Sequence, residues 1–102
     1  MFAMDALQVV AEPRRQEILR LIWREEMDVG ELVERLDLSY PGVSQHLALL
    51  RDAGFVRVRP DGKRRLYRAD HDQLGPLTQF LESFWQGEVD RLARLAEEAE
   101  AS

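Results

Sequence analysis

The residues best suited to bind another molecule are basic, and they lie together between residues 39 and 69. This segment holds seven basic side chains against two acidic ones, a net charge of +5, whereas the whole chain of 102 residues carries −5. A basic patch on an otherwise acidic body orients a polyanion towards one surface. The alternative, an ordinary solvated surface, does not predict this clustering. The basic residues are Arg51, Arg57, Arg59, Lys63, Arg64, Arg65 and Arg68.

A short amphipathic helix begins the same segment. Ser39 can accept a hydrogen bond from a free backbone N–H of the first turn, and Pro41 is tolerated within that turn. Gly54 is suited to end the helix, so the pattern predicts a helix over residues 40–53. The face opposite its apolar residues is small and polar, and it could enter a major groove of DNA. The apolar face consists of Val43, Leu47 and Leu50, and the polar face of Tyr40, Pro41, Ser44, Gln45, Ala48 and Arg51.

The residues after this helix predict a β-hairpin. Residues 55–59 alternate apolar and basic side chains, which is the period-two pattern of a half-buried strand. Pro60, Asp61 and Gly62 favour a turn, and residues 63–68 return as the second strand. A helix-turn-helix followed by a basic hairpin is a winged helix-turn-helix. We therefore expect a mainly α-helical fold with a small two-stranded β-wing.

The remaining elements must hold this helix and hairpin in place within one domain, residues 1–102. Residues 2–11 have a helical apolar face, and Pro13 can open a second helix over residues 13–26. Asp28 and Glu31 resemble a capping box at the start of a helix over residues 31–36. The helix-turn-helix then spans residues 28–53 and the wing residues 55–69. Asp70 and Gln73 can cap a last helix over residues 70–99.

The predicted last helix carries a long apolar stripe at three- and four-residue steps. A winged helix of this size has no other element left to cover so much apolar surface. The stripe therefore predicts a two-fold dimer in which the first and last helices pack against their copies. A last helix folded back on its own core is the alternative. The expected interface residues are Phe2, Leu7, Leu77, Leu81, Phe84, Trp85 and Leu92.

Four segments resemble, in order and spacing, the DNA-binding core of the ArsR-type bacterial repressors. They are AEPRRQEILRLI, VGELVERLDLS, PGVSQHLALLRDAGFV and GKRRLYR, within about residues 7–70. The resemblance implies a homodimer, joined by its first and last helices, that binds double-stranded operator DNA. It also favours a place at the DNA surface for His46, for which packing is the alternative. The expected DNA contacts are Tyr40, Pro41, Ser44, Gln45, His46, Arg51, Lys63, Arg64 and Arg65.

The sequence contains few residues that are suited to catalysis or to metal sensing. The chain has no cysteine and only two histidines, His46 and His71, and it has no motif for a nucleophile or for phosphate binding. Many ArsR-type repressors bind metal ions through cysteines or through histidine and carboxylate pairs, and neither arrangement is visible here. We therefore expect no enzyme activity, no cofactor and no metal site, with His71 at the surface. A repressor that responds to metal through a less obvious site and a winged helix used only for protein contact are the alternatives.

Composition sets the remaining expectations. No apolar run approaches the roughly 20 residues that span a bilayer, and residues 1–4 do not resemble the start of a signal peptide. We expect a cytoplasmic protein without a membrane partner. The sequence does not identify an effector.

Overall fold

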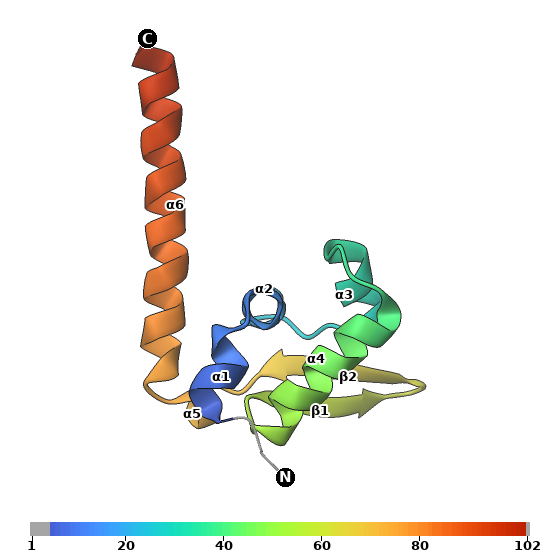
Figure 1. Ribbon diagram of the computed structural model, residues 1–102. Coiled ribbons are helices and arrows are strands. Elements are labelled where there is room, and N and C mark those ends of the chain that lie inside the picture. Colours follow the sequence, from blue (N-terminus) through green and yellow to red (C-terminus); the bar gives the residue numbers. More distant parts are fainter. Residues whose placement is uncertain (1–4, 102) are drawn as a thin grey trace.

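The computed structural model describes residues 5–101, which form six helices and two strands (Figure 1). Helices α1 to α5 and the hairpin form one body, and α6 extends away from it (Figure 1). Phe2 lies outside the described residues. The elements are α1 (Ala6–Ala11), α2 (Pro13–Leu21), α3 (Val29–Arg35), α4 (Tyr40–Asp52), β1 (Val56–Asp61), β2 (Arg64–Ala69), α5 (His71–Leu74) and α6 (Leu77–Ala101).

The short helices begin at side-chain caps. The capping box predicted at Asp28 is confirmed, because its carboxylate accepts from the backbone N–H of Glu31 while the Glu31 side chain accepts from the N–H of Asp28. Ser39 accepts from the N–H of Gly42 at the start of α4. Glu12 caps α2 by accepting from the N–H of Arg15. These bonds satisfy N–H groups that have no partner within a helix, so each helix begins at a defined residue.

A left-handed glycine connects α4 to the wing. Gly54 has φ of +83°, its N–H donates to the Arg51 carbonyl, and the Phe55 N–H donates to the Leu50 carbonyl, both at 2.9 Å. This is a Schellman motif, in which a non-glycine residue would be strained. The predicted end of the helix is confirmed. The motif fixes the direction in which β1 leaves the helix.

The wing is an antiparallel pair with its turn at Gly62 and Lys63. The turn predicted at residues 60–62 was wrong, because Pro60 and Asp61 belong to β1, where Asp61 pairs with Arg64. Pro60 is tolerated there because β1 is an edge strand. The other edge of β2 bonds with Met27, whose N–H and carbonyl both pair with Tyr67.

The second helix is shorter than its sequence pattern predicts. α2 ends at Leu21, not at residue 26, and the chain then turns and bends over residues 22–25 so that Met27 can bond with β2. Backbone pairing with the sheet thus replaces the last turn of the predicted helix. The change places Trp23 at the exit of α2, where it is 6% exposed.

The predicted last helix is divided in two. Gly75 has φ of +53° and Pro76 has no N–H to donate, so α5 ends at Leu74 and α6 begins at Leu77. Leu74 is buried, which anchors the break against the core. The direction of α6 is therefore set at Gly75 and Pro76.

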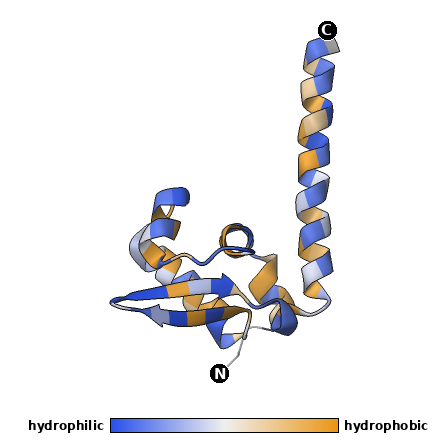
Figure 2. Ribbon diagram, turned by 180° about the vertical axis from the view of Figure 1, so that it is seen from behind, coloured by the Kyte–Doolittle hydropathy of each residue, from blue (hydrophilic) through white to orange (hydrophobic). Residues whose placement is uncertain are grey.

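The beginning of α6 packs on its own protomer. Leu81 is fully buried and Trp85 is 9% exposed, with its ring 4.9 Å from that of Trp23 in an edge-to-face contact. The assignment of Leu81 and Trp85 to a dimer interface was wrong, because both residues belong to the protomer core. Leu77 packs against the same core. Apolar and polar residues continue to alternate along the part of α6 that leaves the body (Figure 2).

Candidate nucleic-acid interface

Helix α4 places its predicted faces as expected. Val43, Leu47 and Leu50 are buried in the core, which confirms the apolar face. On the other side, Tyr40 is 59% exposed, and Pro41, Gln45 and Arg51 are exposed as well. Ser44 and Ala48 are half-buried. The polar face of α4 is thus free to meet a partner at the surface of the body.

The wing brings two cations beside the start of α4. Arg65 and Tyr67 are two residues apart on β2, so their side chains lie on the same face of the hairpin. Tyr67 packs on the core. Lys63 follows at the turn. Among residues 5–101 neither Lys63 nor Arg65 has an ion-pair partner. A groove of about 520 Å³ lies between wing and helix, lined by Asp28, Val29, Gly30, Tyr40, Ser44, Lys63, Arg64, Arg65 and Tyr67.

Arg64 is engaged inside the protein. Its Nε donates to Asp28 Oδ2 at 2.8 Å, and its Nη2 donates to Glu31. The N–H of Glu31 and the guanidinium of Arg64 lower the pKa of the Asp28 carboxyl below its usual value. In this structure Arg64 ties the wing to the first turn of α3, and the expected phosphate contact requires it to leave both carboxylates. Displacing it would leave two carboxylates facing the ligand.

Two further arginines of the wing are paired with acidic residues. Arg57 Nε lies 3.0 Å from Asp70 Oδ2, and Arg59 Nε lies 2.9 Å from Glu26 Oε2. The guanidinium groups of these arginines lower the pKa of Asp70 and of Glu26. The net charge of +5 that residues 39–69 carry is thus largely compensated by acidic residues of neighbouring elements.

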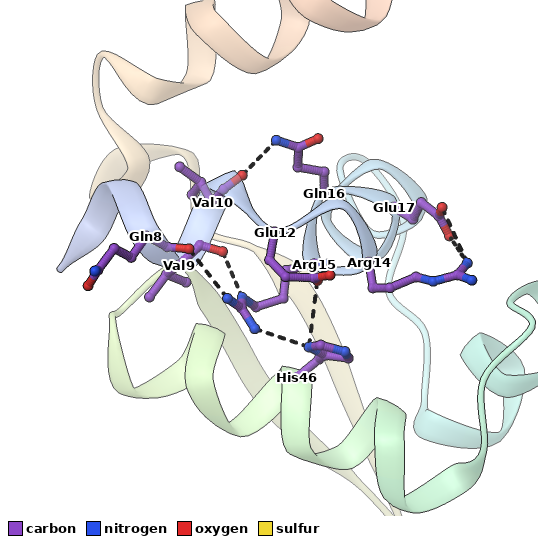
Figure 3. A network of polar contacts seen from close by, with 9 residues as sticks. All are labelled: Gln8, Val9, Val10, Glu12, Arg14, Arg15, Gln16, Glu17 and His46. Carbon is purple, nitrogen blue, oxygen red and sulfur yellow. Dashed lines mark hydrogen bonds and ion pairs between the residues drawn. The ribbon is translucent and has the colours of Figure 1, made fainter. Parts of the chain in front are cut away.

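His46 points away from the polar face of α4, towards the junction of α1 and α2 (Figure 3). Its Nδ1 lies 3.2 Å from Arg15 Nη1 and 3.9 Å from the Glu12 carboxylate, and its side chain is only 21% exposed. His46 thus occupies the packing position that was its alternative to a place at the DNA surface. His46 links the recognition helix to the helices behind it.

Arg15 is the central residue of this junction. It is 4% exposed, and its Nε donates to the Val9 carbonyl at 2.7 Å while Nη2 donates to the Gln8 carbonyl at 3.3 Å (Figure 3). These carbonyls lie in the last turn of α1, where a helix has no internal donors left. The sequence carried a signal that we did not use, because Arg15 shares the helical stripe of Ile18, Leu19 and Ile22. A charged residue on a core stripe indicates a buried partner.

Within residues 5–101 no three acidic, histidine or cysteine side chains converge on a point where a metal ion could bind. His71 is half-buried rather than at the surface, with Nε2 2.8 Å from the Trp23 carbonyl oxygen and its ring centroid 4.3 Å from that of Trp23. None of the helices in this part of the chain combines the length and the apolar character that crossing a membrane requires.

Comparison with known proteins identifies the family. The profile described as "Bacterial regulatory protein, arsR family" matches residues 12–58. The HTH-type transcriptional regulator Rv2034 of Mycobacterium tuberculosis is 38% identical over 90 residues, which cover 88% of this chain and 84% of that protein. The chain belongs to the ArsR family. A second relative, the transcriptional activator HlyU of Vibrio cholerae, is 35% identical over 79 residues, 78% of this chain and 73% of that protein.

A solved structure shares the architecture of this ArsR-family chain. The crystal structure of a possible transcriptional regulator for arsenical resistance superposes with a TM-score of 0.68 at 40% identity, covering 89% of this chain and 95% of that one. The expected winged helix-turn-helix is thereby confirmed. The chain is a DNA-binding transcriptional regulator and not an enzyme.

Proposed function

We propose that this ArsR-family regulator binds an inverted-repeat operator as a homodimer and represses transcription from it. The observation that carries the proposal is the position of Lys63 and Arg65, two cations without an ion pair among residues 5–101, beside the exposed first turn of α4. A helix with a small polar face enters the major groove while neighbouring cations bind the phosphates on either side.

The contacts follow from this placement. Tyr40, Pro41 and Gln45 meet base edges at the exposed start of α4, and Ser44 meets either a base or a phosphate. Arg51, Lys63 and Arg65 bind phosphates or reach into the flanking minor groove. Arg64 and His46 take no part, since each is held by another element. Repression requires only that the bound dimer exclude RNA polymerase from the promoter. Activation, which the name of the relative HlyU describes, requires an additional effect on the promoter. A regulator that binds such an operator acts in the cytoplasm.

The dimer is inferred from apolar surface that the protomer leaves uncovered. Leu7 is 67% exposed, and Phe84 and Leu92 are 45% and 62% exposed. Isolated exposed apolar residues are common, but a row of them on one long helix is typical of an interface. We propose that α6 packs against its copy across a two-fold axis, which sets the two copies of α4 about 34–36 Å apart. The other exposed apolar residues of α6 are Phe80, Val89 and Leu95.

Selection of bound fragments from genomic DNA, followed by footprinting, tests the proposal. The expected result is a symmetric footprint with two half-sites and a lower yield of transcript from the bound promoter in a purified transcription system. Gln45→Ala should flatten the base preference, whereas Gln79→Ala, a matched change on the exposed side of α6, should leave it unchanged. A single asymmetric half-site would contradict the two-fold dimer, and a higher yield of transcript would make the protein an activator.

We also propose that DNA binding is independent of transition metals. A tight zinc site needs four donors drawn from cysteine, histidine and carboxylate, and this chain has no cysteine. Both imidazoles are already engaged, His46 with Arg15 and His71 with the Trp23 carbonyl. The operator complex should therefore survive titration with zinc, nickel, copper or arsenite. Release at stoichiometric metal that is lost in His71→Ala would contradict the proposal.

A further inference from the structure

A cleft walled by two tryptophans lies between the end of α2 and the first half of α6. It consists of two adjoining hollows of about 430 and 310 Å³, which share Arg20, Trp23, Arg24 and Trp85. The first hollow continues to Met27 and Arg35. Hollows of this size lie near the lower end of the range of small-molecule sites. We call this site the indole cleft.

The indole cleft is lined by apolar and by charged side chains. Its three arginines, Arg20, Arg24 and Arg35, outnumber its two carboxylates, Glu25 and Glu82. Trp23 and Trp85 are mostly buried, and the one N–H of Trp23 is already donated to Glu82 at 2.9 Å. Among residues 5–101 the exposed Arg24 and Arg35 have no ion-pair partner, whereas Arg20 lies 3.5 Å from Glu88. The cleft thus offers the small exposed part of two indoles together with two guanidinium groups that are hydrogen-bonded to no other side chain among residues 5–101.

We propose that the indole cleft binds a small organic anion that carries a flat ring and one carboxylate, and that this ligand is the effector of the regulator. The inference rests on the proposed function, since an effector requires an operator complex on which to act. The ring contacts the indoles, as aromatic pairs do in edge-to-face or offset arrangements. The carboxylate accepts paired hydrogen bonds from Arg24 or Arg35, whose planar groups match its geometry.

The first hollow of the cleft remains open in the proposed dimer, because Trp85 is its only lining residue from α6. Gln86 lines the second hollow, and it lies two residues beyond Phe84, which is about 200° around the helix. A partner packed on Phe80 and Phe84 would therefore cover the other side of α6. Val89 lines the second hollow and is also an exposed apolar residue of α6, so the partner borders that hollow. The ligand can reach the cleft without dissociation of the dimer.

The walls of the cleft connect it with both functional parts of the molecule. Trp85 belongs to α6, the helix of the proposed interface. The Ile22 carbonyl accepts from the N–H of Ala69 at the end of β2, and Met27 pairs with Tyr67 in the same strand. A ligand that moves Trp23 against Trp85 shifts the wing relative to α6. Such a ligand changes DNA affinity to the extent that it binds the free and DNA-bound arrangements unequally.

Tryptophan fluorescence tests the proposal directly, because the only two tryptophans of the chain both wall the cleft. The full-length protein is titrated with sodium benzoate or phenylacetate, with sodium chloride of equal ionic strength and the neutral benzamide as controls. We expect a saturable change in emission with either carboxylate. Either Arg24→Gln or Arg35→Gln, whichever removes the guanidinium that binds the carboxylate, should raise the dissociation constant about tenfold, the usual scale of a lost charged bond. Arg94→Gln, an exposed arginine of α6 outside the cleft, should not. An unchanged dissociation constant in both Arg24→Gln and Arg35→Gln overturns the carboxylate contact.

The operator complex provides the second measurement. Operator affinity is first determined without ligand, so that loss of DNA binding refutes the proposed function and leaves the cleft to be judged by fluorescence alone. Saturating carboxylate should then change operator affinity by about fivefold or more, a typical allosteric coupling, in the unchanged protein and in Arg94→Gln. A linear response, or an equal response to benzamide, overturns the site. Saturable binding with unchanged operator affinity overturns the role as an effector.

Discussion

The salt dependence of operator binding distinguishes the free cations of the wing from the paired ones. Each phosphate neutralised contributes a slope of about −0.9 to the logarithm of affinity against the logarithm of salt concentration. With contacts from Arg51, Lys63 and Arg65 in each protomer, a dimer neutralises six phosphates and should show a slope of about −5. Arg65→Ala removes two contacts per dimer, so its slope should fall to about −3.6.

Arg64→Ala is the matched control, because it removes the same side chain from the next position of β2, where the guanidinium is paired with carboxylates. Its slope should remain near that of the unchanged protein, since Arg64 is bonded to Asp28 and Glu31. Fluorescence anisotropy with a labelled operator at several salt concentrations measures all three slopes. An equal loss of slope in the two variants would refute the assignment, because it would mean that Arg64 leaves its carboxylates to bind DNA.

Three further predictions concern assembly and stability. Phe84→Asp should turn the proposed dimer into a folded monomer in sedimentation experiments, since truncating such an anchor often costs about 2 kcal/mol or more. Ala93→Asp, an exposed position about 180° around α6 from Phe84, should remain a dimer. Arg15→Met should lower the free energy of unfolding in urea by about 1–3 kcal/mol, because it removes the donors to the Gln8 and Val9 carbonyls, whereas Arg14→Met should change it by less than about 0.5 kcal/mol. The pKa values of Asp28, Asp70 and Glu26 are lowered in the folded state. The stability that these carboxylates provide is therefore present above about pH 4 and is lost as pH falls through their folded pKa values. A urea midpoint that stays constant through this pH range would contradict the ion pairs of the wing.

The local chemistry of the helix-turn-helix was readable from the sequence. The caps at Asp28 and Ser39, the glycine at residue 54 and the two faces of α4 depend on neighbours within a few residues, and these predictions were correct. The errors at the end of α2 and at the wing turn have another origin. In both places a strand pairing with a distant segment replaced the structure that local propensity favours.

The candidate site was predicted less completely, because a charge count does not show which charges are paired. Lys63 and Arg64 are neighbouring basic residues in the sequence. Arg64 pairs with the carboxylates of Asp28 and Glu31, whereas Lys63 has no ion pair among the described residues. His46 lies at the edge of a helical face, so a small rotation decides whether it meets DNA or Arg15. The apolar stripe of α6 was correctly recognised, but the sequence could not divide it between core and surface, since the break at Gly75 and Pro76 determines where the helix passes the body.

The part of α6 that extends beyond the body has a consequence for the amount of protein in the cell. From Val89 to Glu100 every residue of α6 is exposed in the protomer, so this half of the helix gains little stability from packing there. This segment would therefore become ordered when a partner covers it, and its folding would depend on protein concentration. Dilute chains would present a frayed end to proteases, while concentrated ones would protect each other. Synthesis and degradation would then set a threshold level below which the regulator does not accumulate.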